Sequence, residues 1–488
     1  MRSAVSEAVW AGRARTLAFC FLAVLAVAST WVLVGAKPAH AADFRVNSTA
    51  DAGDALPGNG QCATEILPEG VRGICTLRAA IEEANANDVS DTITFSSGMS
   101  GTITLALGQL TIANDITGPD LTIHGPGGSG LAVSGNNLSR VFLIDSAADV
   151  TIDELTISSG RTGITGIGAG IYNGGTLRLS HSTVSGNTGG QAGGGIISSG
   201  TLTLENSTVS GNTNTDIGGG IFNDYGTLTL INSTVSGNTS DTDSGGIHNQ
   251  GTMTLENSTV SANEAAGAGG GITNSGTAKL TNTIVARNSA TTNPDVSGTL
   301  SFSSQGNNLI GDTSGSLGWS ASDLLRQDPL LGPLQNNGGP TKTHALLPGS
   351  SAIDRAANSA CLFTDQRGVQ RKDGNGDGTV ICDIGAFEAP TNTRPTITNP
   401  KPTPGSNTRD RTPSIAATVS DAQTNLAKTN IKLFVDGNRK STFSYDRSTD
   451  RLSYTSGRLS FGGHTVKIIA TDLVLTTTRS WRFKVVRG

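Results

Sequence analysis

The sequence predicts an all-β protein with a parallel β-helix in its middle and a β-sandwich at its end. Three observations predict this fold: a repeat of about 25 residues, a short amphipathic segment before the repeat, and a series of alternating stretches after a proline-rich segment. Glycine accounts for 64 of 488 residues, whereas charged residues make up only 15%. This composition excludes a coiled coil and a charge-rich disordered chain. The 4% of aromatic residues argues against a large stacking platform for sugars or bases.

The repeat occupies residues 171–298 in five similar units. Each unit contains three strand-like stretches separated by Gly, Asn and Ser. These stretches are too short for aligned hairpins, but each can pair in parallel with its equivalent one period later, which coils the chain into a parallel β-helix. Weaker copies extend the pattern over residues 101–312, which is about eight coils. The units begin, at intervals of 25, 25, 26 and 25 residues, with Ile171, Ile196, Ile221, Ile247 and Ile272.

Equivalent side chains of successive coils are predicted to stack in columns. Besides the isoleucines, the aliphatic columns are Leu179, Leu204, Leu230, Leu255 and Leu280, and Val184, Val209, Val235, Val260 and Val285. Asparagine recurs at two turns, where stacked amides can hydrogen-bond along the axis. The main ladder is predicted to contain Asn187, Asn212, Asn238, Asn263 and Asn288, and a shorter series contains Asn206, Asn232, Asn257 and Asn282. The Asn-Ser-Thr triplets also match glycosylation sequons, but their fixed place in the repeat favours the ladder.

Residues 1–41 have the features of a secretory signal peptide. An uncharged apolar run at 17–34 follows two arginines and precedes the small-x-small sequence Ala39-His40-Ala41. We expect cleavage there and a secreted, extracellular protein, associated with the cell surface or free, that keeps no membrane span. The alternative is an uncleaved anchor, because 18 residues just span a bilayer.

Cleavage would remove Cys20 and leave four cysteines. An even number in an exported chain indicates two disulfides. The local pairing joins Cys62 to Cys75 and Cys361 to Cys382, whereas the other pairings would tie opposite ends of a long body. A zinc site is the alternative, but no Cys-x-x-Cys sequence or nearby histidine pair supports it.

Residues 42–100 are predicted to cap the first coil, because an open end of parallel strands would pair with another molecule. Within this cap, Leu77, Ile81 and Ala84 have helical spacing. Thr76 stands where an N-cap residue is expected. We therefore predict a short capping helix beside the Cys62–Cys75 bridge.

Two segments resemble those of a known protein family. Cys75-Thr-Leu-Arg-Ala-Ala-Ile81 resembles the Cys-Ser-Leu-Arg-Glu-Ala (CSLREA) motif of exported bacterial proteins with right-handed parallel β-helix repeats. Residues 332–354, then DQRGVQR and CDIGAFE, resemble the choice-of-anchor Q domain of the same proteins, which we place at residues 313–389. The resemblance covers about residues 43–389 and implies a right-handed β-helix, but no activity. The family's glutamate is Ala79 here, so the reciprocal half of a capping box is missing.

After this region, residues 390–413 contain six prolines and read as a linker or entry strand. Residues 414–488 alternate at the spacing of a β-sandwich, and they resemble the immunoglobulin-like modules of bacterial surface proteins. Residues 391–488 carry 16 Lys/Arg and 6 Asp/Glu, whereas residues 42–390 carry 14 and 32. The basic domain is expected to bind an envelope polymer or polysaccharide that is polyanionic; a solvated surface without a ligand is the other interpretation, and no nucleic-acid partner is expected.

No catalytic residue emerges from the sequence. Asn214-Thr215-Asp216 matches one motif of polygalacturonases, but the Asp-Asp pair and the Gly-His-Gly sequence of those enzymes are missing, and an Arg-x-Lys stands only in the last domain, at Arg482-Phe-Lys484. Further carboxylates are scattered in variable turns, and two histidines stand alone, which is typical of structural residues. These residues are Asp241, Asp243, Glu264, His181 and His248.

One segment has the pattern of a calcium loop. In Asp373-Gly-Asn375-Gly-Asp377-Gly378, oxygen ligands stand at positions 1, 3 and 5 and glycine at position 6. Position 12 is Ile384 instead of glutamate, so a full EF-hand is absent. Asp373, Asn375 and Asp377 are the candidate calcium ligands, and a polar turn without an ion is the alternative.

The sequence therefore predicts an exported, non-enzymatic surface or matrix protein that presents a β-helix and binds an envelope or extracellular partner, as adhesins do. The alternative is a carbohydrate-active enzyme, a polysaccharide lyase or hydrolase, with an accessory binding module. A third interpretation makes the β-helix a spacer for the basic domain.

Overall fold

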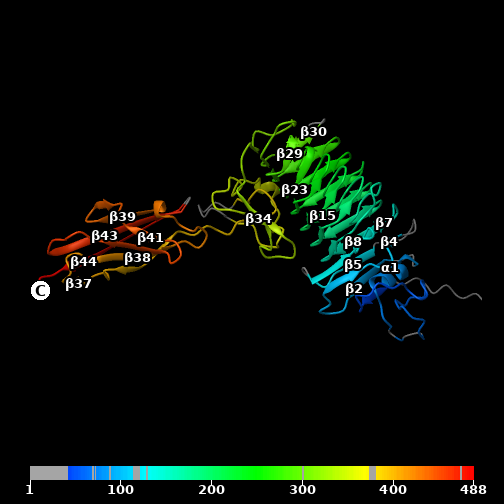
Figure 1. The fold of residues 1–488 in the computed structure, drawn as a ribbon, viewed down its shortest axis with the longest axis horizontal. Coiled ribbons are helices and arrows are strands. Elements are labelled where there is room, and N and C mark those ends of the chain that lie inside the picture. Colours follow the sequence, from blue (N-terminus) through cyan, green and yellow to red (C-terminus); the bar gives the residue numbers. More distant parts are fainter. Residues whose placement is uncertain are drawn as a thin grey trace, which may run out of the picture. The chain divides into compact units, whose positions relative to one another are not determined.

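The computed structural model describes residues 42–488, apart from residues 69–70, 72, 87–89, 114–120, 128–129, 299–301, 373–380 and 473–474. The predicted leader, residues 1–41, lies outside this part of the chain. Within it, no helix is long and apolar enough to span a bilayer. Figure 1 shows the order of the elements along the chain.

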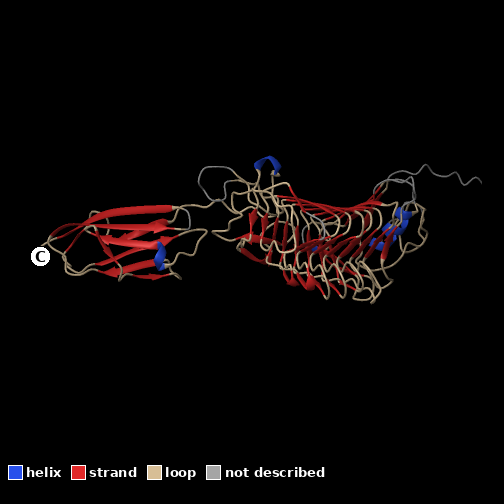
Figure 2. Cartoon of the chain, turned by 90° about the horizontal axis from the view of Figure 1, so that it is seen from above, coloured by secondary structure: helices blue, strands red, loops and turns tan. Residues whose placement is uncertain are grey.

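A parallel β-solenoid forms the larger part of the described chain, as predicted. Each coil contributes one strand to each of three sheets, A, B and C, and every pairing within these sheets is parallel. Figure 2 shows the equivalent strands of successive coils lying side by side. Some coils also contribute a short fourth strand to sheet D, which the sequence pattern did not predict.

The strand bounds follow the repeat. Sheet A contains β1 (Asp43–Val46), β2 (Asp91–Phe95), β5 (Leu121–His124), β8 (Asp149–Asp153), β11 (Thr176–Ser180), β15 (Thr201–Glu205), β19 (Thr227–Ile231), β23 (Thr252–Glu256), β27 (Thr277–Thr281) and β31 (Phe302–Ser304). Sheet B contains β3 (Gly101–Thr104), β6 (Leu131–Ser134), β9 (Thr156–Ser158), β12 (Thr183–Ser185), β16 (Thr208–Ser210), β20 (Thr234–Ser236), β24 (Thr259–Ser261), β28 (Ile284–Ala286), β32 (Leu309–Ile310) and β33 (Leu324–Leu325). Sheet C contains β4 (Leu110–Ile112), β7 (Phe142–Ile144), β10 (Ile171–Asn173), β14 (Ile196–Ser198), β18 (Ile221–Asn223), β22 (Ile247–Asn249), β26 (Ile272–Asn274) and β30 (Val296–Gly298). Sheet D contains β13 (Thr188–Gly189), β17 (Thr213–Asn214), β21 (Thr239–Ser240), β25 (Glu264–Ala268) and β29 (Ser289–Thr292).

The predicted aliphatic columns form the solenoid core. Ile171 pairs with Ile196, and the pairing continues through the later isoleucines in exact register. The leucine and valine columns are paired in the same way. All these side chains are buried in one apolar cluster. Parallel pairing places each side chain against its copy about 4.8 Å away, so identical residues pack without gaps along the axis.

A helix closes the first coil, as predicted. Helix α1 (Leu77–Asn85) begins after Thr76, whose hydroxyl accepts a hydrogen bond from the Ala79 backbone N–H at 3.1 Å. Arg78 forms an ion pair with Asp51, with Nε 2.6 Å from Oδ1, and donates to the Gly108 and Gln109 carbonyls. The helix is therefore fixed both by its cap and by an arginine that reaches the first coils.

After β33, the chain leaves the coils. We call residues 331–389 the flank segment; it contains the hairpin β34 (Leu331–Gln335) and β35 (Thr343–Leu346) and the short 3-10 helix η2 (Asn358–Ala360). Gln366 donates to the Thr208 hydroxyl at 2.8 Å and accepts from the Thr234 hydroxyl at 2.6 Å. The flank segment thus covers the outer face of sheet B on the later coils, where Thr208 is buried, whereas Thr183 of the preceding coil is only half-buried.

Residues 396–485 form a β-sandwich of two sheets around its own apolar core. Sheet E contains β36 (Thr396–Lys401), β38 (Ser414–Ser420), β42 (Arg451–Thr455) and β41 (Ser444–Asp446). Sheet F contains β37 (Asn407–Thr408), β44 (Thr476–Val485), β43 (Gly462–Thr471), β39 (Ile431–Val435) and β40 (Asn438–Lys440), with a 3-10 turn η3 (Lys428–Asn430) before β39. All pairings are antiparallel except that of β37 with β44. The proline-rich segment contributes β36 and β37.

Candidate functional site

The structure places the predicted disulfide and ladder residues as follows. Disulfides join Cys62 to Cys75 and Cys361 to Cys382. In the main asparagine ladder, each side-chain oxygen accepts from the backbone N–H and the side-chain amide of the preceding ladder residue. The ladder ends where Asn288 donates to Oδ1 of Asp295 at 2.9 Å. The candidate calcium ligands Asp373, Asn375 and Asp377 lie outside the described residues.

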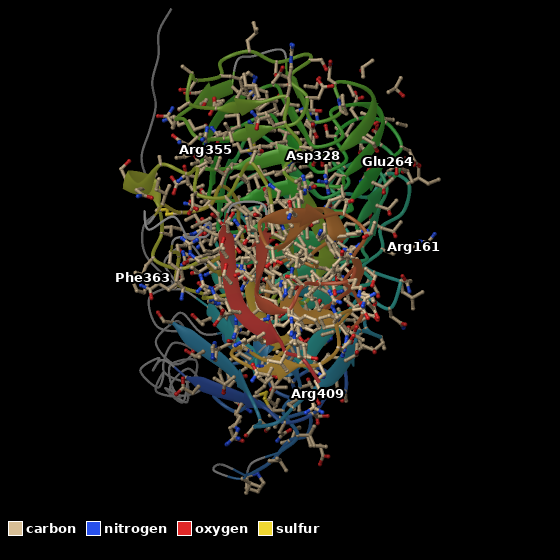
Figure 3. All side chains as sticks on the ribbon, turned by 90° about the vertical axis from the view of Figure 1, so that its left-hand side faces the viewer. Arg161, Glu264, Asp328, Arg355, Phe363 and Arg409 are labelled. Carbon is tan, nitrogen blue, oxygen red and sulfur yellow. A yellow bond between two sulfur atoms is a disulfide. The ribbon has the colours of Figure 1, made fainter. Side chains whose placement is uncertain are left out.

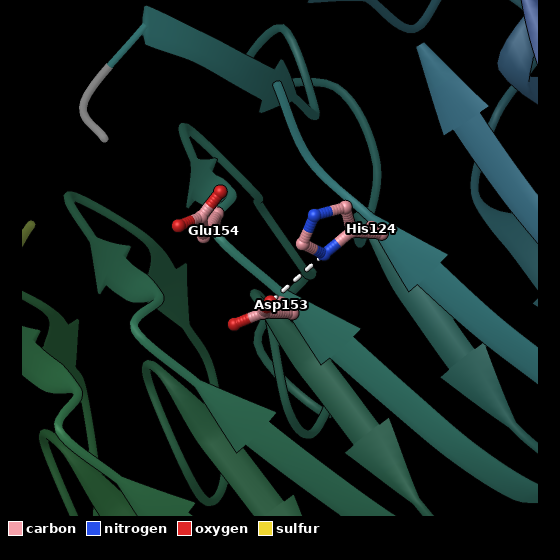
Figure 4. Close-up of side chains that lie close together, drawn as sticks. All are labelled: His124, Asp153 and Glu154. Carbon is pink, nitrogen blue, oxygen red and sulfur yellow. Dashed lines mark ion pairs between the residues drawn. The ribbon is translucent and has the colours of Figure 1, made fainter. Parts of the chain in front are cut away.

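A cluster of imidazole and carboxylate groups lies at the edge where the strands of sheet A end. We call His124, Asp153, Glu154 and His181 the edge cluster (Figure 4 shows the first three). His124 and Asp153 are the last residues of β5 and β8 and are register partners. The donor atoms of His124, Asp153 and Glu154 all lie within 4.8 Å of one another, the only such group of three or more in the described chain.

Asp153 lies between two imidazoles. Its Oδ2 is 2.9 Å from Nδ1 of His124, and its Oδ1 is 3.2 Å from Nδ1 of His181 on the next coil. His181 was expected to stand alone, and this expectation was wrong: the turn after β11 directs it back along the axis to the preceding coil. The side chain of His124 is 53% exposed and that of Asp153 is 21% exposed, so solvent reaches the cluster.

Two members of the edge cluster occupy a turn position that belongs to asparagine on the four coils that follow. The residue after each sheet-A strand from β8 to β27 has a left-handed backbone, with φ of 55° at Glu154, 45° at His181 and 50° at Asn206. Asparagine and histidine are found in this conformation more often than glutamate is. The later residues at this position are Asn232, Asn257 and Asn282. Two adjacent coils therefore carry a carboxylate and an imidazole, which can bind metals or transfer protons, at the turn position where the following coils carry asparagine.

The flank segment covers the later asparagines of this turn. Asn232 donates to the Thr364 carbonyl at 2.8 Å, Asn257 to the Ala360 carbonyl at 3.0 Å, and Asn282 accepts from the Ala357 N–H at 2.7 Å. The shorter asparagine series is thus mainly a docking line for the flank segment rather than a ladder; only Asn282 and Asn257 hydrogen-bond to each other. The edge cluster lies on earlier coils, beyond these contacts.

The sequence segments DQRGVQR and CDIGAFE meet in a buried ionic network. Arg371 pairs with Glu388 at 3.1 Å, and Arg371 also donates to the side chain of Asn232 on the solenoid. Burial raises the pKa of Asp383 well above its usual value, and the adjacent Glu388 raises it further. Burial also raises the pKa of Glu388. Because these groups bond to the segment's own backbone and to the coils, the network holds the flank segment in place.

The other carboxylates and the second histidine examined in the sequence do not form a site. Glu264 projects outward from the coils, as does Arg161 (Figure 3). Asp243 accepts from the Ala268 N–H at 2.6 Å and therefore fixes a turn. His248 is buried, stacks on Phe222 with ring centroids 4.9 Å apart, and has its pKa lowered by burial. These residues have structural contacts.

The outer face of sheet F is basic. Its side chains alternate with the buried ones, so they are directed away from the core. Lys467 lies over the ring of Phe434, with Nζ 4.7 Å from the ring centroid. In the described residues, no carboxylate forms an ion pair with any cation of this face. The cations of the basic face are Lys432, Arg439, Lys467, Arg482 and Lys484.

The acidic residue in the turn between two strands of sheet F is already bound. Asp436, in the turn between β39 and β40, accepts from the Thr465 N–H and lies 2.7 Å from Nδ1 of His464. Burial acts to lower the pKa of His464, but its hydrogen bonds to Asp436 and the Ser460 carbonyl raise it overall. In contrast, the outer face of sheet E is rich in Ser and Thr, and its Arg451 stands opposite Asp446. The outer face of sheet F therefore carries five cations and the outer face of sheet E an arginine set against a carboxylate.

No family model and no curated protein matches the sequence. Among solved structures, part of the chain is similar to dimeric latent PorU from Porphyromonas gingivalis, with 18% identity and a TM-score of 0.17. That alignment covers 30% of this chain and 16% of the PorU chain. A similarity of this extent carries no functional conclusion.

Sequence reasoning missed three of the four residues of the edge cluster. His124, Asp153 and Glu154 belong to the weaker upstream copies of the repeat, where the coil register is difficult to assign. The available signal was positional: once these copies are aligned on the clear units, Glu154 and His181 fall on the asparagine position of the turn. The basic composition of the last domain was evident, but its concentration on one sheet was not.

Proposed function

We propose that this protein is an exported, adhesin-like surface or matrix component whose basic face binds a polyanionic envelope or extracellular polymer. The observation that supports this most is the row Arg439, Phe434 and Lys467 on adjacent strands, which further cations extend and which has no acidic ion-pair partner among the described residues. Such a face attracts a repeating anion, and its aromatic ring offers an apolar contact to a sugar ring. The β-solenoid would then present this binding domain and contribute its own long surface.

We also propose that the chain is related to the exported right-handed β-helix proteins with CSLREA and choice-of-anchor Q segments. In support, Thr76 and Arg78 of the first segment fix the capping helix, and residues of the second segment form the buried network of the flank segment. The sandwich is proposed to be immunoglobulin-like. The two disulfides are compatible with an oxidising, extracellular location.

Charge neutralisation on matched faces tests the binding proposal. The variant Lys432→Gln/Arg482→Gln removes two charges from the basic face, and the control Lys401→Gln/Arg451→Gln removes two exposed charges from sheet E. Each cation near an anionic surface contributes about 1 kcal/mol, so the first variant should bind about thirtyfold more weakly. The control should change binding much less.

The assay is titration of the full chain with polygalacturonate and with heparin at low and moderate salt, with neutral dextran as the uncharged probe. Selective loss of binding in the basic-face variant, together with a lower salt dependence, supports the proposal. Equal losses in both variants would mean that only the net charge matters, and no binding by the unaltered protein would reject a polyanionic ligand.

A further inference from the structure

The edge cluster has the donor set of a transition-metal site. Two imidazoles and two carboxylates are ligands that Zn²⁺ and related divalent ions accept, whereas Ca²⁺ and Mg²⁺ prefer oxygen alone. We propose that His124, Asp153, Glu154 and His181 bind one divalent transition-metal ion such as Zn²⁺. This inference rests on the solenoid alone and is independent of the function proposed for the sandwich.

The distances support such a site. Ligand atoms about 2.0–2.2 Å from a tetrahedral ion are themselves about 3.4 Å apart. Nδ1 of His124 is 2.9 Å from one oxygen of Asp153, and Nδ1 of His181 is 3.2 Å from the other. Small side-chain rotations would therefore admit an ion between His124 and Asp153, whereas His181 lies outside the group of mutually close donor atoms and would have to turn toward the ion to bind it. Glu154 follows Asp153 directly, and its carboxylate lies within 4.8 Å of the His124 and Asp153 donor atoms.

The side-chain amide of Asn206 can fix the tautomer of His181 that a metal ion at Nδ1 requires. Nδ2 of Asn206 lies 3.3 Å from Nε2 of His181, while the buried Oδ1 of Asn206 contacts no hydrogen-bond donor in the described chain. The oxygen and nitrogen of an amide are exchanged by a 180° rotation. After that rotation, Oδ1 would accept from Nε2–H, and Nδ1 of His181 would offer its lone pair to a metal.

The position of the cluster in the repeat gives a further reason. Along the column of sheet-A strand ends, His124 and Asp153 are followed by Ser180, Glu205 and Ile231. The pairing of a histidine with a carboxylate in adjacent coils therefore occurs once in this column. It occurs on the part of the edge that the flank segment does not bind, where an ion can enter from solvent.

Calorimetric titration with ZnCl₂ tests the proposal on the full, tag-free chain, with CaCl₂ and MgCl₂ as comparison ions. We expect one saturable Zn²⁺ site per chain, weakened at least about tenfold by His124→Ala and by Asp153→Asn. The matched control is Glu205→Gln, which removes a carboxylate from the same column at a position paired with Arg178. Unchanged unfolding midpoints would show that the variants are folded.

Absence of saturable Zn²⁺ binding, or equal weakening by His124→Ala and Glu205→Gln, would overturn the proposal. Substitution with Co²⁺ gives a second measurement, because its visible absorption depends on the number and type of ligands. The His181→Ala variant should change this spectrum while keeping weaker binding. An unchanged spectrum would remove His181 from the ligand set and contradict the four-residue site.

Discussion

The asparagine ladder offers the most direct test of what holds the coils together, and Asn238 is its middle member. Its side chain is fully buried and takes part in four hydrogen bonds. Two run from the backbone N–H and side-chain amide of Asn212 to Oδ1 of Asn238, and two run from Nδ2 of Asn238 to the Val209 carbonyl and to Asn263. The Asn238→Ala substitution removes all four.

The expected cost follows from these bonds. A hydrogen bond contributes about 1 kcal/mol net, and a buried donor without an acceptor costs about 1–3 kcal/mol. Asn212 keeps the Val184 carbonyl for its side chain, but its backbone N–H loses its acceptor. We therefore expect Asn238→Ala to lower the free energy of unfolding of the solenoid by about 3–5 kcal/mol.

Urea unfolding followed by tryptophan fluorescence measures this change. Among the described residues, Trp319 reports on the solenoid, where it stacks on Phe302, and Trp481 reports on the sandwich. A Trp481→Phe background therefore isolates the solenoid signal. The control Thr229→Ala alters an outward side chain of β19 and should cost less than about 1 kcal/mol. If Asn238→Ala costs no more than this control, the ladder does not stabilise the coils.

Three further outcomes follow from single contacts. Thr76→Ala should lower stability by about 1–2 kcal/mol and increase hydrogen exchange in α1, because the Ala79 N–H loses its acceptor; unchanged exchange would contradict the cap. Burial lowers the pKa of His248, so protonation of this side chain favours the unfolded chain. The folded state is therefore fully stable with respect to this group above about pH 6.5 and loses stability as the pH falls below that value. His248→Phe should reduce the stability lost between about pH 7 and about pH 5, as measured by thermal unfolding. The Ala42 nitrogen lies 2.8 Å from Oδ1 of Asp91, and cleavage after Ala41 would make it an ammonium group that pairs with this carboxylate. Mass spectrometry of the exported protein should therefore find Ala42 as the first residue. A different first residue would contradict the predicted cleavage site.

The solenoid could be predicted because the same packing contact recurs in every coil. A column of isoleucines at constant spacing has one geometry that buries every copy, namely parallel stacking in register. The pairing of Cys62 with Cys75 was likewise predictable, because the other pairings would tie distant parts of the chain together. In these cases the information lies in local spacing, which a sequence displays directly.

The flank segment and the edge cluster depend on contacts that spacing does not encode. Gln366 binds Thr208 across 158 positions of sequence, and no periodicity relates the two. His181 reaches Asp153 on the preceding coil from a turn with a left-handed backbone, and strand periodicity does not show where such a turn directs its side chain. The charge of the last domain was readable, but assigning Lys432 and Arg482 to one face requires the strand register.

The flank segment also limits how the number of repeats can vary. Its contacts span a fixed number of coils: Thr341 donates to the backbone carbonyl of Asn206, and the Ala357 N–H donates to the side chain of Asn282. Duplicating or deleting a unit within that length would leave every sheet pairing possible and yet displace the anchoring side chains from their partners. The coils before Asn206 carry no such constraint, so a unit inserted there would lengthen the solenoid without displacing the anchoring contacts of the flank segment.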